Sequence, residues 1–469
     1  MSGHGCCRGL SGRGIGAGLL VLLAALGCGG SRESAAAPAA PAGGGAAPAA
    51  SVRRLYDITG VIGSGQSLSI GAQAADVANT TQPFSNLKLA LGTATVPPFD
   101  PNDASLSLVP LVEPIRPFPN TYPSAYPRNI YGETPHTAMG NQVSTLVRAA
   151  DGGEYVTAHT VVGENGQGMV RLRKGAEETV DGDKSQGRAY AATLFEVAAI
   201  KRLATAQNES YGVGAIILTH GETDSGSAAY EQDLVQLWTD YNADLRAITG
   251  QAESIPLLVT QQHGIDFAEG AVRGASVSAL AQWRVGVDHP RDILCVGPKY
   301  QYPYAADTVH LDTRGYQLLG EKYGQVYFQR IVLGRDWAPL QPTNVTREGR
   351  TITVTFHVPV PPLAWDDSLP APHQSALTEW RAARGFELRS GTTALPIENV
   401  AISGESVVVT SGADIPAGAV LGYAVTSDGS VSPKTSRRIG QLRDSDPFVG
   451  ATTKQAQPNY SVAFEWPLP

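Results

Sequence analysis

Short apolar runs alternate with amphipathic helical stretches from about residue 55 to residue 334, and this alternation constrains the fold more than any other feature of the chain. Most of the runs are apolar on both faces, as expected for parallel strands that are covered on both sides. Between them, apolar side chains recur at spacings of three and four, which is typical of helices with one buried face. The rhythm predicts an open α/β sheet with its active loops at the carboxyl ends of the strands. The expected strands are Leu55–Ile62, Tyr155–Val162, Gly214–Thr219, Pro256–Gln261 and Ile293–Val296.

Beyond residue 334 the pattern changes to short stretches in which polar and apolar residues alternate. Thr351–Val358 is the clearest of them, and its β-branched residues indicate a half-buried strand. The chain has 469 residues, more than one core usually organises. We therefore predict an α/β domain over residues 53–336 and an all-β sandwich over residues 340–469. Further strands are expected at Phe386–Arg389, Val407–Thr410 and Leu421–Thr426, with one helical pattern at Ser375–Ala383.

For two features of these regions the sequence allows two interpretations each. The segment Pro97–Arg128 is rich in proline, so we expect a long irregular excursion that either shapes a binding site or only covers the sheet. The tryptophans near and within the β-rich part could stack on sugar rings or fill its core. They are Trp337, Trp365, Trp380 and Trp466.

The first 28 residues have the pattern of an export signal. Arg8 and Arg13 precede an apolar stretch that is too short to span a bilayer comfortably. It ends in Ala25-Leu26-Gly27-Cys28, which resembles the lipobox of bacterial lipoprotein signals, and residues 29–52 are a Gly/Ala/Pro-rich tether. We predict a lipid on Cys28 and a place in the bacterial cell envelope, with the lipid anchor in the membrane; an ordinary secretory signal is the alternative. Cys295 then has no disulfide partner and lies in an apolar run, which predicts a buried thiol.

Charge and spacing exclude several other classes. A net charge of −8 gives no electrostatic footprint for nucleic acid. The histidines at 136, 159, 263 and 289 show no zinc-ligand spacing, so we interpret them as surface or loop residues and expect no metal. The run Gly163–Gly168 reads Gly-x-x-Gly-x-Gly rather than the dinucleotide pattern, so no cofactor is expected either.

The turn after the first strand contains the best candidate nucleophile, Ser67, in Gly63-Ser64-Gly65-Gln66-Ser67. A glycine-rich turn from strand to helix can present a serine hydroxyl where the free N–H groups of the helix favour negative charge. A phosphate-binding loop does not fit, because no Gly-Lys-Ser/Thr ending follows. The Gly-x-Ser-x-Gly elbow does not fit either, because Ser69 stands where the second glycine is required.

Two further polar clusters follow predicted strands. Asp307 precedes His310 by three residues, a spacing that lets a carboxylate orient an imidazole which accepts the proton of a serine. The segment His220–Asp224 comes directly after an apolar run, where polar groups are costly unless they have partners. A functional block and a simple helix cap at Asp224 or Ser225 are both open for this segment.

Together these residues resemble the SGNH (GDSL-like) hydrolase superfamily, and in particular its sialate O-acetylesterase and carbohydrate esterase family six branch. Gly65-Gln66-Ser67, Gly221-Glu222-Thr223-Asp224 and Asp307-Thr308-Val309-His310 are similar to three blocks of that branch, and Gly163–Gly168 stands where the family has its glycine block. The resemblance covers about residues 55–334. It implies a three-layer sandwich with a central parallel sheet.

The resemblance also implies roles for individual residues. Ser67 would attack the acyl carbonyl, His310 would take its proton, and Asp307 would orient His310. The oxyanion would be bound by backbone N–H groups of Ser67 and of a glycine in the loop, Gly166 or Gly163. Supporting positions would be Gln66, Asn165 and Glu222.

The sequence departs from the family at two points. The branch has glutamine before its Gly-Glu pair, where this chain has His220. The wider superfamily uses asparagine as a third oxyanion donor, so Thr223 or Asn165 would have to serve here, with His220 as a further possible donor.

The resemblance implies a serine esterase that removes acetyl groups from sugars or polysaccharides through an acyl-enzyme. One alternative is a hydrolase of the same superfamily acting on longer acyl chains, as lipases and thioesterases do. The other is a surface lipoprotein that binds glycans with a decayed catalytic site.

Overall fold

The computed structural model describes residues 51–91, 99–115, 132–176, 187–263, 276–372, 377–425 and 439–469. The export signal, Cys28 and nearly all of the tether lie outside the described residues, so these predictions stay predictions. Residues 50–469 form one compact unit, and the boundary expected between residues 336 and 340 is not tested by it. Within the described part of the chain, no helix is long and apolar enough to cross a membrane.

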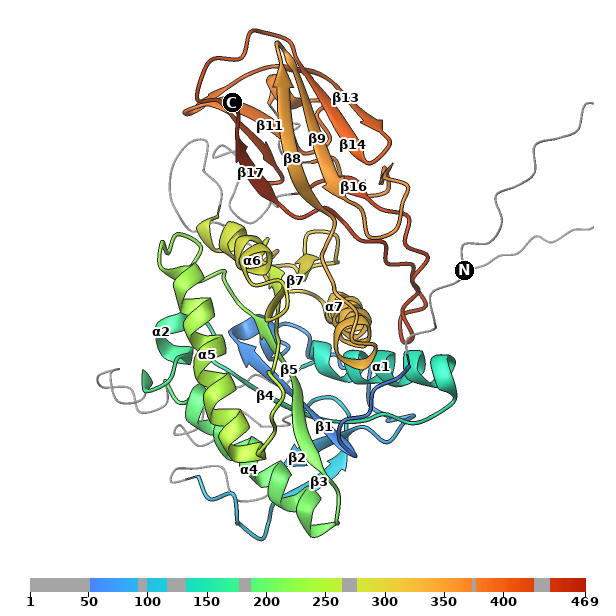
Figure 1. Ribbon diagram of the computed structural model, residues 1–469. Coiled ribbons are helices and arrows are strands. Elements are labelled where there is room, and N and C mark those ends of the chain that lie inside the picture. The colour runs from blue at the N-terminus through green and yellow to red at the C-terminus, as the bar shows by residue number, and fades with distance from the viewer. Residues whose placement is uncertain are drawn as a thin grey trace, which may run out of the picture. The chain divides into compact units, whose positions relative to one another are not determined.

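A seven-stranded sheet lies at the centre of the α/β part, with strand order β3-β2-β4-β1-β5-β6-β7 (Figure 1). All neighbouring strands are parallel except β2 and β3, which pair antiparallel at one edge. Each expected strand is present within a few residues of its expected bounds. The strands are β1 (Ile58–Gly65), β2 (Leu87–Ala90), β3 (Ser107–Pro110), β4 (Val156–Gly163), β5 (Tyr211–Thr219), β6 (Leu257–Gln261) and β7 (Ile293–Pro298).

Two strands were not expected, β2 and β3. Both are only four residues long, and β3 has no fully buried residue, so neither forms a continuous apolar run. β3 lies inside the proline-rich stretch 97–128, where an irregular excursion was expected. The described part of that stretch, residues 99–115, is therefore partly an edge strand of the sheet.

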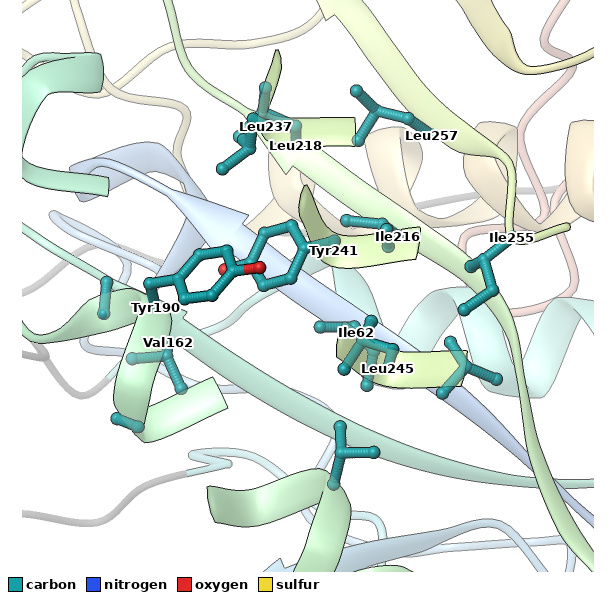
Figure 2. Packing of buried hydrophobic residues seen from close by; sticks show 14 of the residues in the cluster. Ile62, Val162, Tyr190, Ile216, Leu218, Leu237, Tyr241, Leu245, Ile255 and Leu257 are labelled. Carbon is teal, nitrogen blue, oxygen red and sulfur yellow. The ribbon is translucent and has the colours of Figure 1, made fainter. Parts of the chain in front are cut away.

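Helices cover both faces of the sheet. Ile62 and Ile216 belong to a core cluster with α4, α5 and α6, whereas Val61 and Ile217, their neighbours in sequence, belong to a second cluster with α1 and α7. Adjacent strand residues point to opposite faces, so this division defines a three-layer sandwich. Figure 2 shows the cluster between the sheet and helices α4 and α5, where the stacked rings of Tyr190 and Tyr241 lie near Ile216 of β5. The helices are α1 (Pro135–Asp151), α2 (Met169–Leu172), α4 (Ala189–Ala206), α5 (Tyr230–Thr249), α6 (Val277–Asp288) and α7 (Thr313–Tyr327).

The C-terminal part consists of antiparallel sheets, as expected from its alternating pattern. One four-stranded sheet has the order β13-β14-β9-β8, a second has β12-β11-β15-β17, and β10 pairs with β16 (Figure 1). The strands are β8 (Gln341–Glu348), β9 (Thr351–His357), β10 (Ala364–Trp365), β11 (Phe386–Ser390), β12 (Thr393–Ala394), β13 (Ile397–Ser403), β14 (Ser406–Ser411), β15 (Val420–Tyr423), β16 (Leu442–Arg443) and β17 (Phe464–Pro467).

Some details of this part differ from expectation. The helical pattern at Ser375–Ala383 forms only a short 3-10 turn over Thr378–Trp380 in its described residues. Trp380 is buried in the core, and the other three tryptophans in question are half-buried rather than exposed. Cys295 is a free, buried thiol, as expected, and it belongs to the same core cluster as the β-sheets.

Candidate active site

Ser67 follows the carboxyl end of β1 in the central sheet. Gly65 has a φ of +140°, and a Cβ on it would lie 2.2 Å from the carbonyl oxygen of Thr219, so the turn requires glycine there. Ser67 opens a 3-10 turn that ends at Ser69, whose hydroxyl donates to the carbonyl oxygen of Gln66 at 2.7 Å. The N–H groups of Ser67 and Leu68 therefore come first in the turn and have no carbonyl partner within it.

The loop after β7 brings His310 to this serine. The distance from His310 Nε2 to Ser67 Oγ is 2.7 Å, and the distance from His310 Nδ1 to Asp307 Oδ2 is 2.6 Å. A carboxylate only accepts, so Nδ1–H donates to Asp307 and Nε2 is left to accept the hydroxyl proton of Ser67. The structure thus joins Ser67, His310 and Asp307, the three residues predicted to act together, in one chain of hydrogen bonds.

Asp307 also shapes its own loop. Its Oδ1 accepts the backbone N–H groups of Val309 and His310, each at 3.0 Å, around a left-handed Thr308 with φ of +59°. Burial alone would raise the pKa of Asp307, but the hydrogen bonds from His310 and Val309 outweigh it and lower the pKa. The carboxylate therefore stays ionised, which suits a group that orients an imidazole and stabilises its charged form.

The glycine loop packs beside the nucleophile turn. Gly163 is the register partner of Gly65, and a Cβ on Gly163 would lie 2.3 Å from Ser69 Oγ. The next residue, Glu164, donates its N–H to Gly65 O at 2.9 Å, and its buried carboxylate accepts the N–H groups of residues 187–189 at the start of α4. Burial raises the pKa of Glu164, although these hydrogen bonds act to lower it. The loop is thereby fixed to β1 on one side and to α4 on the other.

Gly166 lies at the tip of this loop. Its φ of +70° is left-handed, no atom lies within 4 Å of the place a Cβ would take, and the residue is exposed together with Asn165. An exposed N–H near the nucleophile turn is what an oxyanion donor requires. The assignment of Gly166, Gly163 and Asn165 to that role stays a prediction.

His220 was predicted as a further oxyanion donor, but the structure engages both of its ring nitrogens elsewhere. It is fully buried, its Nδ1 lies 2.9 Å from the hydroxyl of Tyr230, and its Nε2 lies 3.0 Å from the carbonyl oxygen of Gln167. Nε2–H therefore donates to Gln167 and Nδ1 accepts from Tyr230, so neither ring nitrogen has a hydrogen left for an oxyanion. Burial lowers the pKa of His220, which keeps the ring neutral in this arrangement.

The rest of the His220–Asp224 segment also holds neighbouring loops. Asp224 Oδ2 accepts the N–H of Met169 at 2.7 Å and so caps α2 directly after the glycine loop. The N–H of Thr223 donates to Gln66 Oε1 at 3.3 Å, which leaves only its exposed side chain available to an oxyanion. The segment is therefore a support for the glycine loop and for Gln66 rather than a cap of α5.

Glu222 forms a buried ion pair that sequence reasoning missed. Its Oε1 lies 2.7 Å from Lys299 Nζ, and the two side chains are 2% and 0% exposed. Lys299 follows β7 directly and Glu222 lies three residues past the end of β5, so the pair joins two strand ends beside the site. The available signal was a charged residue immediately after a buried strand, the same signal that singled out residues 220–224.

Three of the four histidines that were interpreted as surface or loop residues are buried: His136 lies in α1 and His159 in β4, whereas His263 does lie in a loop, after β6. His136 and His159 meet through their Nδ1 atoms at 3.1 Å, and His263 is 1% exposed. Burial lowers the pKa of His136 to about 3 and that of His159 well below its ordinary value, so both rings are neutral. Across the described ranges, no group of three or more His, Cys, Asp or Glu side chains could hold a metal ion.

No family model matches the chain, and no curated protein matches it either. Among solved structures, it is similar to a carbohydrate acetylesterase from Xanthomonas citri, with 14% identity and a TM-score of 0.50 over 87% of this chain and 80% of that one. It is also similar to a protein from Arabidopsis thaliana (14% identity, TM-score 0.39, 58% of this chain and 98% of that one) and to NanS (10% identity, TM-score 0.34, 58% and 97%). The likeness to the Xanthomonas structure shows the fold and bears out the predicted α/β architecture with its C-terminal β-sheets.

Proposed function

We propose that this chain is a serine esterase of the SGNH superfamily that removes acetyl groups from carbohydrates. The observation that carries the proposal is the unbroken chain of hydrogen bonds from Asp307 through His310 to Ser67, with distances of 2.6 and 2.7 Å. A half-buried carboxylate, an imidazole and a serine hydroxyl that are hydrogen-bonded in this order are the groups that perform acyl transfer by covalent catalysis.

The geometry supports a two-step reaction. As Ser67 Oγ attacks the acetyl carbonyl, His310 Nε2 takes its proton, and Asp307 stabilises the imidazolium that forms. His310 then returns the proton to the sugar oxygen that leaves. In the second step His310 takes a proton from water, which attacks the acetyl-serine. As the bond between the acetyl group and Ser67 Oγ breaks and acetate leaves, His310 returns that proton to Ser67 Oγ.

The tetrahedral intermediate needs donors for its oxyanion. We assign this role to the N–H of Ser67 at the start of its 3-10 turn and to the N–H of Gly166 at the exposed tip of the glycine loop. With His220 and the N–H of Thr223 already engaged, Asn165 and the side chain of Thr223 are the remaining candidates for a third donor. Losing one such donor costs about 10²–10³ in rate.

The acetylated sugar as substrate is the finer part of the proposal. It is supported by the motif blocks around Ser67, Glu222 and His310 and by the fold shared with a carbohydrate acetylesterase from Xanthomonas citri. We also propose that a lipid on Cys28 tethers the enzyme to the cell envelope.

Hydrolysis of 4-nitrophenyl esters from acetate to octanoate, together with acetate release from acetylated xylan and O-acetylated sialic acid, tests the proposal. We expect the highest kcat/KM for acetate and a loss of at least about 10⁴-fold in Ser67→Ala. Ser64→Ala is the matched control, because Ser64 is a buried hydroxyl in β1 outside the hydrogen-bonded chain. A preference for octanoate would replace the acetylesterase with a longer-chain hydrolase, and full turnover in Ser67→Ala would refute the serine mechanism.

A further inference from the structure

A cavity of about 270 Å³ lies at the amino ends of the central strands, away from Ser67. β1 contributes Thr59 to its lining, and β5 contributes Val213 and Gly214. Ser67 follows the opposite end of β1. At a strand rise of about 3.3 Å per residue, Thr59 and Ser67 are roughly 25 Å apart, so the cavity is separate from the candidate active site.

Two tyrosines line the cavity, and each has its hydroxyl engaged elsewhere. The ring of Tyr56 lies against Gly212, where an added Cβ would come within 2.3 Å of the ring, and its hydroxyl donates to Glu253 Oε2 at 2.7 Å. The hydroxyl of Tyr155 lies 3.2 Å from that of Tyr327. Both tyrosine hydroxyls are thus already hydrogen-bonded within the protein, and only the faces and edges of the rings are available to contact a ligand. The apolar lining also includes Leu55, Pro256 and Ile331.

The charged lining is mainly cationic. Arg53 and Arg330 both line the cavity, and Glu253 is the acid among the described lining residues. Glu253 already accepts from Tyr56; that hydrogen bond, together with the nearby charge of Arg53, lowers the pKa of Glu253. One carboxylate therefore faces two guanidinium groups.

Arg330 brings a guanidinium group to this lining. One of its terminal nitrogens donates to the carbonyl oxygen of Arg291 at 3.1 Å, and the other lies 3.9 Å from Asp336 Oδ1, beyond hydrogen-bond distance. The side chain is 19% exposed, so part of the guanidinium can be reached by a ligand. A carboxylate is the acceptor that fits a guanidinium best.

We infer that this cavity binds a small aromatic carboxylate, with the carboxylate on Arg330 and the ring against the tyrosine side of the lining. A cavity of about 150 Å³ accommodates benzene, so the larger volume here has room for a ring and its carboxylate. A sugar fits less well because the amide of Gln251 is already spent on the N–H and carbonyl of Val213, at 2.7 and 3.0 Å. The inference concerns a second site and does not rest on the proposed esterase activity.

Calorimetric titration of the full chain with benzoate tests this site. Benzyl alcohol is the neutral probe of the same size, and glucuronate is the carboxylate on a polar ring. We expect saturable binding of benzoate, with benzyl alcohol at least about 10-fold weaker because it lacks the charge-assisted hydrogen bond. Absence of saturable benzoate binding, equal affinity for the alcohol, or tighter binding of glucuronate would each overturn the inference.

Variants locate the binding. Arg330→Gln should weaken benzoate at least about 10-fold, whereas Arg335→Gln, at an exposed arginine outside the lining, should bind benzoate as the parent chain does. Leu55 is 46% exposed, so Leu55→Asp keeps the fold and places a negative charge at the cavity. It should weaken benzoate and leave benzyl alcohol unaffected. Unchanged benzoate affinity in both Arg330→Gln and Leu55→Asp would rule the cavity out.

Discussion

At the scale of single residues, Asp307 does two things with its two oxygens. Oδ1 accepts the N–H groups of Val309 and His310 and so closes the loop, while Oδ2 accepts the proton on His310 Nδ1. One carboxylate thereby sets both the place of the imidazole and its tautomer. The short Asp-x-x-His spacing makes this possible, because the loop that carries the histidine is also the loop that the aspartate folds.

Asp307→Asn separates these two tasks. The amide oxygen can still accept the backbone N–H groups, so we expect the fold to persist. Its NH₂ group, however, donates toward Nδ1 and forces the imidazole proton to Nε2, which can then no longer accept from Ser67. We expect kcat for acetyl esters to fall by about 10⁴-fold with a melting temperature close to that of the parent chain. A loss of less than 10-fold in kcat would argue against the assigned role of Asp307.

At the scale of elements, the site depends on how the ends of β1, β4 and β5 are joined. His220 and Asp224 after β5 hold the glycine loop after β4 through Gln167 and Met169. Thr223 holds Gln66 beside the nucleophile. The glycine loop is thus positioned by hydrogen bonds from a neighbouring strand end, and His220 acts through Gln167 rather than on the substrate.

This arrangement predicts different outcomes for two variants of His220. His220→Gln keeps a side-chain N–H that can reach the carbonyl of Gln167, so we expect kcat within about 10-fold of the parent value. His220→Leu removes the donor to the carbonyl of Gln167 and the acceptor of the Tyr230 hydroxyl proton, at a cost of about 1–3 kcal/mol. It should lower kcat at least 10-fold while KM changes little. Steady-state kinetics and urea unfolding check both points, and a fully active His220→Leu would contradict the positioning role.

At the scale of the whole molecule, acids other than those of the candidate active site are buried, among them Glu113 and Glu133. Glu113 accepts the hydroxyls of Thr134 and Thr137 at 2.6 and 2.9 Å. Burial and the neighbouring charge of Glu133 raise the pKa of Glu113 to about 8, whereas in the unfolded chain it titrates near 4.5. The folded protein therefore keeps a proton that the unfolded chain releases. Its stabilising effect is complete below pH 4.5 and is lost as the pH rises to 8.

Glu113→Gln removes this titration while keeping the shape of the side chain. We expect the difference in unfolding free energy between variant and parent to move in favour of the variant by about 1.4 kcal/mol per pH unit between pH 5 and 8. Urea unfolding at pH 5, 6.5 and 8 measures it. Comparing the two proteins cancels the opposite effect of His136 and His159, whose lowered pKa values destabilise the fold as the pH falls. A difference that stays constant with pH would contradict the assignment.

The sequence predicted the parts of this molecule that have a local signature. The long strands β1, β4 and β5 could be read from continuous apolar runs, and Ser67 and the Asp307–His310 pair from short spacings next to strand ends. The edge strand β3 could not, because a four-residue strand without a fully buried residue forms no continuous apolar run. Neither could the roles of His220 and Lys299, since their partners Gln167 and Glu222 lie far away in the sequence and only the packed sheet brings them together.

The central claim is that Ser67 is a nucleophile activated by His310, and covalent labelling tests it most directly. We predict that a fluorophosphonate probe forms one adduct on the full chain, which peptide mass spectrometry locates on Ser67. Labelling should be absent in Ser67→Ala and slowed at least about 10³-fold in His310→Ala, while Ser64→Ala labels at the parent rate. Failure of the parent chain to react, or an adduct on another residue, would contradict the account.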